Sequence, residues 1–159
     1  MDTQLFLPFA ESIQSVFSTM LGLDVSVGEI EPVGISEDHD VSGIIGLSGD
    51  VTGNAALCFS AETAGKIIES FVGMEMDPGS EDFADAIGEL ANMVAGSAKA
   101  MYDGLHVSLS CPSVVVGLNH KIRSQKELPA VKVPCDCAHG SFFIEVTLKR
   151  TSDAQTAAA

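Results

Sequence analysis

Basic and aromatic residues are scarce in this sequence. It holds 8 lysine and arginine residues against 22 aspartate and glutamate residues, with no tryptophan and one tyrosine. The formal net charge of −14 argues against nucleic acid or an anionic membrane as a partner, because like charges repel. Aliphatic side chains must fill the core. Hydrophobic residues make up 46% of the 159, which predicts one folded domain over residues 1–150 and a disordered tail over 151–159.

Long apolar runs are also absent. No uninterrupted stretch is long enough to cross a bilayer, so no membrane partner is expected. The first residues include an acid and no basic segment ahead of an apolar run, which is unlike a secretion signal. Four cysteines without such a signal predict a cytoplasmic protein with reduced thiols.

Cysteine and histidine come together at one place, in Cys135, Cys137 and His139. A structural zinc site uses four ligands, and no spacing ties Cys58 or Cys111 to this segment. Two strand cysteines beside a turn histidine are the simpler interpretation. We therefore predict no metal site and no cofactor of the protein's own.

The strongest pattern is a helix over Ser80–Asp103. Ser80 is a typical N-cap, the acids after it face the positive end of the helix dipole, and Gly104 suits a left-handed C-cap. Apolar residues at helical spacing define a buried stripe of Phe83, Ile87, Leu90, Val94, Ala98 and Met101. The opposite stripe consists of Asp85, Glu89, Asn92, Gly96, Lys99 and Asp103.

Two polar residues on this outer stripe lie one turn apart. Glu89 and Asn92 are three positions apart, so they project from the same outer face. Gly88 and Gly96 lie one turn to either side of Asn92, and each glycine costs about 1 kcal/mol of helix stability relative to alanine. The pattern predicts a low surface around a protruding carboxamide, which the backbone of a partner can approach.

The rest of the chain alternates between helices and strands. The expected elements before the long helix are a helix over Asp2–Leu21 with Phe9, Ile13, Val16, Phe17 and Met20 inward, a strand over Asp24–Val33, a loop over Ser36–Asp40, a hairpin of Val41–Ser48 and Val51–Ser60, and a helix over Ala61–Gly73. Those after it are two short strands or one interrupted strand over Leu105–Leu109 and Ser113–Gly117, a polar loop over Asn119–Glu127, and a hairpin of Leu128–Cys137 and Ser141–Lys149.

The chain also repeats itself. Residues 9–18 align with 83–92, the helix exits 22–27 and 104–109 match, and a hairpin follows each exit. Coincidence between two amphipathic helices is the alternative, but the matching exits favour duplication. The predicted fold class is α+β, with an antiparallel sheet, long helices packed on one face and a pseudo-twofold duplicated helix–strand–hairpin unit. Only the second copy carries Glu89 and Asn92.

Taken alone, Glu89 and Asn92 are compatible with an ordinary solvated helix face. The spacing Asp85-x-x-x-Glu89-x-x-Asn92, followed by Pro112 after the next short strand, resembles the signature of the CheC/CheX/FliY family of chemotaxis phosphatases. The likeness covers residues 5–150. A single copy on the second helix resembles the CheX branch, whereas CheC typically carries two. Pro112 lies closer to Asn92 than in that signature, which leaves its role open.

The resemblance implies a phosphatase that removes the aspartyl phosphate of a CheY-type response regulator. The receiver would supply Mg²⁺ and a lysine, so the enzyme mainly has to position a water molecule. Catalytic roles fall to Asn92, which holds the water, and Glu89, which pairs with that lysine. Contact with the partner is implied for Asp85, Gly88, Gly96 and Lys99. Ordinary helix-start electrostatics also account for Asp85, and we favour that structural interpretation.

A second function remains open at this point. Relatives in the same family include non-catalytic switch components, so the chain can instead be a receiver-binding adaptor in chemotaxis or flagellar signalling. The resemblance further implies a homodimer joined through its sheets. The sequence permits this, because the strands over Leu105–Gly117 and the C-terminal strands can each provide an edge, and it does not decide between them.

Overall fold

A computed structural model describes residues 3–33, 37–123 and 128–151. The predicted tail after Thr151 and parts of two predicted loops lie outside the described residues. The helical elements are η1 (Thr3–Leu5, a 3₁₀ turn), α1 (Leu7–Val16), η2 (Phe17–Leu21, a π-helix), α2 (Ala61–Val72) and α3 (Glu81–Ala100). The strands are β1 (Ser26–Val27), β2 (Glu31–Pro32), β3 (His39–Gly49), β4 (Val51–Phe59), β5 (Val107–Leu109), β6 (Ser113–His120), β7 (Ala130–Cys137) and β8 (Gly140–Arg150).

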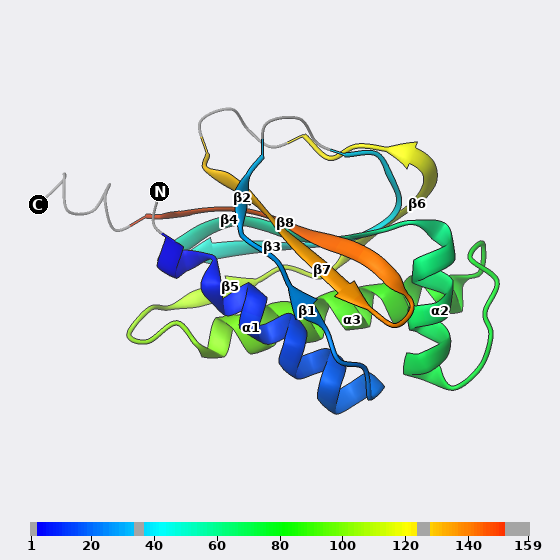
Figure 1. Cartoon of the computed structure of the whole chain (residues 1–159). Coiled ribbons are helices and arrows are strands. Elements are labelled where there is room, and N and C mark those ends of the chain that lie inside the picture. Colours follow the sequence, from blue (N-terminus) through cyan, green and yellow to red (C-terminus); the bar gives the residue numbers. More distant parts are fainter. Residues whose placement is uncertain (1–2, 34–36, 124–127, 152–159) are drawn as a thin grey trace, which may run out of the picture.

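The strands form one eight-stranded sheet in which the paired strands run antiparallel. The order is β1-β7-β8-β4-β3-β5, with β2 also paired with β7 and β6 also paired with β3. Helices α1 and α3 lie side by side on one face of the sheet (Figure 1). The buried Ser12 hydroxyl of α1 donates to the Val94 carbonyl of α3 at 2.5 Å. The predicted α+β fold with helices on one face is confirmed.

The strand order is symmetric about the centre of the sheet. Strands β4 and β8, one from each predicted hairpin, pair in the middle. The β1 and β2 segments of the first copy pair with β7 of the second, and β5 and β6 of the second copy pair with β3 of the first. In each copy, the short strands outside the hairpin thus pair with the hairpin of the other copy. This exchange is what a pseudo-twofold duplication requires. Helix α2 is an insertion between the copies.

Helix α3 matches its prediction closely. The Ser80 hydroxyl accepts a hydrogen bond from the Phe83 backbone N–H at 3.2 Å, which is the predicted N-cap. Five residues of the predicted inner stripe are 0–2% exposed, namely Phe83, Ile87, Leu90, Val94 and Ala98. The sixth, Met101, follows the last helical residue and is only partly buried. The inner side of α3 therefore faces the main core between helices and sheet.

The first helix differs from its prediction. The expected continuous helix is a 3₁₀ turn, an α-helix and a π-helix in succession. The predicted stripe is buried as far as Phe17, whereas Met20 is 52% exposed. A π-helix has more residues per turn than an α-helix, so positions after Phe17 lag behind the α-helical register. Met20 is thereby carried out of the stripe, and its predicted place in the core is wrong.

Several strand boundaries also differ. The strand expected over Asp24–Val33 is two short segments against β7, with Pro32 on the edge of the sheet. Strand β3 begins at His39, within a predicted loop, and β6 continues to His120. The Asp40 carboxylate accepts hydrogen bonds from the backbone N–H groups of Asn119 (3.0 Å) and Ala61 (2.8 Å), which ties these segments together.

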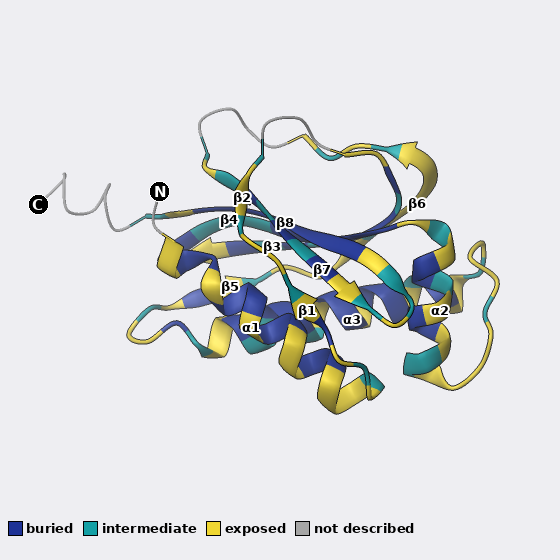
Figure 2. Ribbon diagram, in the orientation of Figure 1, coloured by how far each residue is buried: buried dark blue, intermediate teal, exposed yellow. Residues whose placement is uncertain are grey.

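Burial on the two faces of the sheet is unequal. Figure 2 shows buried residues along β3, β4 and β8 and exposed residues on the outer turns of α1. The face away from the helices carries a small cluster of Ala56, Cys58 and Phe143, against which Ile44 and Ile122 pack. Among the described residues, no helix is long and apolar enough to cross a bilayer.

Candidate functional site: the outer face of helix α3

The predicted polar stripe lies on the outer face of α3. Asp85, Glu89, Asn92 and Lys99 are all exposed, as the helical spacing predicts. Within the described part of the chain, the side chains of Glu89 and Asn92 make no hydrogen bond or ion pair. An exposed carboxamide without an internal partner offers one acceptor and two donor hydrogens to an incoming molecule. The carboxylate one turn away offers only acceptors, so the pair suits a water molecule and a cation together.

The two glycines of this helix lie in different surroundings. Gly96 is partly exposed, and a Cβ atom added there would have no heavy atom within 4 Å. Gly88 is buried, and an added Cβ would lie 3.2 Å from Cγ of Pro112 and 3.4 Å from Cγ2 of Val114. The predicted low, open surface is therefore found at Gly96, whereas Gly88 is covered by the chain itself.

This packing gives Pro112 a structural position. Its ring occupies the space that a side chain at position 88 would fill, directly beside the residue that carries the Glu89 carboxylate. Pro112 itself remains exposed, between β5 and β6. Sequence reasoning left the role of Pro112 open because nothing in the local pattern shows that a loop proline and a helix glycine meet.

Helix α3 is also held closely against β3. A Cβ added to Gly43 would lie 3.0 Å from Cβ of Ala91, 3.1 Å from Cγ2 of Ile87 and 3.3 Å from the Ile87 carbonyl oxygen. Ile87 and Ala91 lie on either side of Glu89 in the sequence, on the buried side of the same turns. The absence of a side chain at Gly43 thus sets how deeply the site-bearing part of α3 lies on the sheet.

We expect Gly43→Ala to lower the free energy of unfolding by about 1–3 kcal/mol, because the added methyl group overpacks a buried contact. Urea denaturation monitored by circular dichroism measures this change. Gly65→Ala is the matched control: position 65 on α2 has no neighbour within 4 Å of an added Cβ. It should be neutral or stabilising by about 1 kcal/mol or less. A Gly43→Ala protein as stable as the wild type would contradict this account of the helix position.

Cys135, Cys137 and His139, considered above as possible metal ligands, make other contacts in the fold. Cys135 is buried in the main core, and burial raises the pKa of its thiol to about 12. Cys137 packs against the same core, and the His139 ring Nε2 lies 2.7 Å from the Ser70 hydroxyl. In residues 3–33, 37–123 and 128–151, no group of three or more cysteine, histidine or acidic side chains is placed to hold a metal ion.

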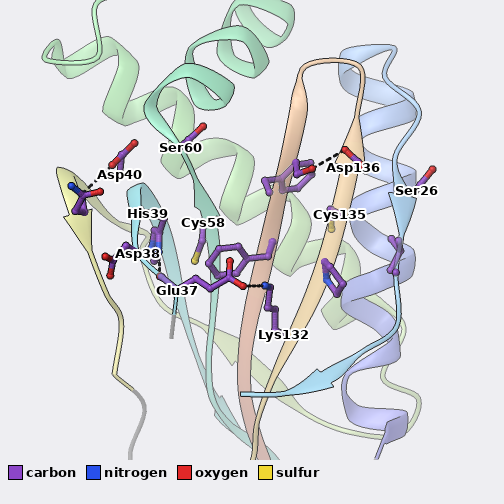
Figure 3. A pocket seen from close by; sticks show the side chains of 17 residues that line it. Ser26, Glu37, Asp38, His39, Asp40, Cys58, Ser60, Lys132, Cys135 and Asp136 are labelled. Atoms are coloured by element: carbon purple, nitrogen blue, oxygen red, sulfur yellow. Dashed lines mark hydrogen bonds and ion pairs between the residues drawn. The ribbon is translucent and has the colours of Figure 1, made fainter. Parts of the chain in front are cut away.

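A pocket that sequence reasoning missed lies elsewhere on the molecule. Its volume is about 640 Å³, and its lining includes Glu37, His39, Cys58 and Lys132 (Figure 3). None of the lining residues belongs to α3. The Lys132 ammonium pairs with the Glu37 carboxylate and lies 5.0 Å from the centre of the Phe143 ring. The pocket is therefore separate from the predicted Glu89 and Asn92 site.

Comparison with known proteins shows the family to which the chain belongs. The sequence profile described as "Chemotaxis phosphatase CheX" matches residues 41–136, which include all of α3. The chain belongs to the CheX family. CheY-P phosphatase CheX of Thermotoga maritima is 34% identical to it over 128 residues, which cover 78% of this chain and 83% of the relative. The family resemblance predicted from Asp85, Glu89 and Asn92 is confirmed.

Solved structures agree with the CheX-family fold. A CheC-like superfamily protein from Shewanella sp. PV-4 has a TM-score of 0.86 and 27% identity, with 94% of this chain and 99% of that chain covered. CheX in the CheX–CheY–BeF3–Mg²⁺ complex of Borrelia burgdorferi has a TM-score of 0.77 and 24% identity, with 92% and 98% covered. The second likeness concerns the fold alone.

Proposed function

We propose that this chain is a phosphatase that hydrolyses the aspartyl phosphate of a CheY-type response regulator. The observation that carries the proposal is the position of Glu89 and Asn92: both are exposed in the middle of α3 and free of internal partners among the described residues. They belong to a CheX-family chain whose relative in Thermotoga maritima is named a CheY-P phosphatase. The site lies on a convex helix, so its substrate is another protein's surface rather than a small molecule held in a cavity.

In this proposal Asn92 positions the attacking water. Its carboxamide oxygen accepts a hydrogen bond from the water and aligns it with the phosphorus–oxygen bond, while the NH₂ group can donate to a phosphoryl oxygen. Water attacks phosphorus, the bond to the aspartyl oxygen breaks, and the products are inorganic phosphate and the free carboxylate. An acyl phosphate is already reactive, so positioning accounts for most of the catalysis.

Glu89 would pair with the lysine that the receiver holds near its phosphoryl group. A charge-assisted hydrogen bond of this kind fixes the register of α3 on the receiver. Asp85, Gly96 and Lys99 continue the same exposed face and would contact the partner around the pair. Gly88 would support the contact indirectly, because the absence of a side chain there lets Pro112 pack beside Glu89. Mg²⁺ is expected on the receiver, and no cofactor is proposed for this chain.

Binding and loss of phosphate, measured together, distinguish this proposal from the adaptor alternative. A receiver treated with Mg²⁺ and beryllium fluoride, which mimics the phosphoryl group, should bind the wild-type protein. Glu89→Ala should weaken that binding about tenfold, the value of one charge-assisted hydrogen bond. Glu69→Ala, an exposed acid on α2, is the control and should bind normally. Tight binding by the wild type without accelerated loss of phosphate would establish an adaptor instead.

We also propose a cytoplasmic homodimer joined through β6. Among the described strands, β6 pairs only with β3, so its other edge has unpaired backbone groups, and the strand carries three exposed apolar side chains, Val115 (41%), Val116 (45%) and Leu118 (79%). An exposed strand edge with apolar side chains favours pairing with a second copy. The negative charge of the chain does not prevent this, because the exposed residues at the edge are mainly uncharged.

Val116→Lys should shift the dimer to monomer, because a charge would be buried in the strand-to-strand contact. We expect the weight-average mass in sedimentation equilibrium to fall from twice the chain mass toward the chain mass of 16.5 kDa. Leu7→Lys is the matched control, since Leu7 is an equally exposed apolar residue (46%) on α1. A wild-type protein that is already monomeric, or a Val116→Lys protein that stays dimeric, would contradict the proposed interface.

A further inference from the structure

Two histidines share one serine on the sheet face away from the helices. His39 begins β3, His120 ends β6, and the strand register places them opposite each other. The Ser42 Oγ atom lies 2.5 Å from Nε2 of His39 and 2.7 Å from Nε2 of His120. Ser42 is fully buried and His39 is 4% exposed, whereas His120 at the end of β6 is only partly buried. The ring centres of the two histidines are 4.4 Å apart.

The other ring nitrogens fix the tautomers. Nδ1 of His39 lies 3.0 Å from the Glu37 carbonyl oxygen, and Nδ1 of His120 lies 2.6 Å from the Gly117 carbonyl oxygen. A carbonyl oxygen only accepts hydrogen bonds, so each Nδ1 must carry hydrogen. In two neutral imidazoles, both Nε2 atoms would then be bare acceptors. The Ser42 hydroxyl has one hydrogen, so one Nε2 would face the hydroxyl oxygen with no hydrogen between them.

We propose that His39, Ser42 and His120 form a site, buried at Ser42 and His39, that binds a single proton shared by the two imidazoles. With one proton added, one Nε2–H donates to Ser42 Oγ and the Ser42 hydroxyl donates to the other Nε2. Every nitrogen of the pair then has a hydrogen-bond partner. A second proton would bring two cations together, and the Ser42 hydrogen would have to find another acceptor.

The influences on a proton at His39 oppose one another, and on balance they lower the pKa of its imidazole. Burial lowers the pKa of His39, the Glu37 carbonyl opposes that shift, and the charge of His120 lowers it further. The carboxylates of Asp38 and Asp40 favour a cation at His39, and Figure 3 shows both acids beside it.

Two lysines lie close to the site, and each pairs with an acid. Lys132 of β7 lines the same pocket as His39 and pairs with Glu37. Lys121 is paired with Asp38 at 3.4 Å. From β4, the Cys58 thiol stays neutral because burial raises its pKa well above the usual range. From β8, the Phe143 ring packs edge-on against His39, and the Glu145 carboxylate acts electrostatically on Cys58. Asp38 and Asp40 are therefore the acids that favour a proton at His39.

The bound proton completes the hydrogen bonds that join His120, at the end of the edge strand β6, to Ser42 and His39 of β3. When the proton leaves, one of the two Nε2···Oγ hydrogen bonds is lost, so opening of β6 should increase as the pH rises. At acid pH the dependence on pH is the opposite, and stability falls as the pH falls. The folded state lowers the pKa of His39, so its contribution to stability is present above the unfolded value of about 6.5 and is lost as the pH falls.

The site is tested by ¹⁵N nuclear magnetic resonance of the imidazole nitrogens in the full chain, between about pH 5 and 9. We expect protonated Nδ1 in both histidines at every pH, and a first step in which the pair takes up one proton divided between the two Nε2 signals. Independent uptake of one proton by each histidine, or bare Nδ1 atoms, would overturn the proposal.

Two variants separate the shared proton from simple burial. Ser42→Ala removes the bridge, so both histidines should titrate independently. His120→Gln supplies a neutral NH₂ group that can donate to Ser42, so protection of the β6 amides from hydrogen exchange should no longer fall as the pH rises. In the wild type that protection should fall about fivefold as the proton leaves, the value of one hydrogen bond. If His120→Gln keeps the wild-type pH dependence, the proposal is wrong, even if Ser42→Ala fails to fold.

Discussion

Asn92→Ala is expected to slow loss of phosphate from a CheY-type receiver by about 10²-fold, with binding to the receiver retained. The proposed site has one group that can align the water, and alanine offers neither an acceptor nor a donor at that place. Because Asn92 is exposed and has no internal partner among the described residues, its loss should leave folding unchanged. The measurement is the rate of phosphate release at saturating receiver, compared with thermal unfolding of the same protein.

The pseudo-twofold repeat offers a matched control for this experiment. Ser18 occupies the position in the first copy that corresponds to Asn92, and it is also exposed. Ser18→Ala should dephosphorylate the receiver at the wild-type rate. An Asn92→Ala protein with full activity would show that the water is positioned elsewhere, and equal losses in both variants would indicate a general effect of altering the helices.

Gly53→Ala is expected to destabilise the fold more than any other single methyl addition considered. Gly53 lies in β4 with φ of +142°, and an added Cβ would lie 1.7 Å from the Thr147 carbonyl oxygen of β8. Backbone atoms of the central strand pair would have to separate, and alanine strongly disfavours this backbone conformation. We expect the free energy of unfolding to fall by about 4 kcal/mol or more, or the protein to fail to fold.

Chemical denaturation and the yield of folded protein measure this effect, with Gly65→Ala again as the control. Gly65 is helical, unstrained and open, so the same change of one methyl group should be harmless there. A well-folded Gly53→Ala protein of normal stability would show that β4 and β8 do not pair in the register observed here, Gly53 opposite Leu148.

Helix α3 and the order of the sheet could be predicted from the sequence. The signals for α3 lie within the helix itself, and those for the sheet occur twice along the chain. The cap at Ser80 and the 3.6-residue apolar period fix α3 to within a few residues. The repeat predicts the symmetric sheet, because two equivalent units must bury equivalent faces. The same periodicity places Glu89 and Asn92 on the exposed side, which is why the candidate site could be located without a structure.

What sequence reasoning missed depends on contacts between distant segments. Met20 was expected in the core, but a π-helical turn carries it outward. Gly88 was expected to be open to a partner, but Pro112 covers it. The proton site brings together β3 and β6, and nothing in either strand alone signals that His39 and His120 share Ser42.

The most direct test of the proposed phosphatase is turnover by the wild-type chain at low concentration. A CheY-type receiver is phosphorylated, freed of phosphodonor and mixed with a small fraction of its concentration of this protein. We predict that loss of phosphate is accelerated in proportion to the protein added, with many phosphates released per molecule. Loss at the receiver's own rate, or loss that stops after one phosphate per molecule, would contradict hydrolysis at the outer face of α3.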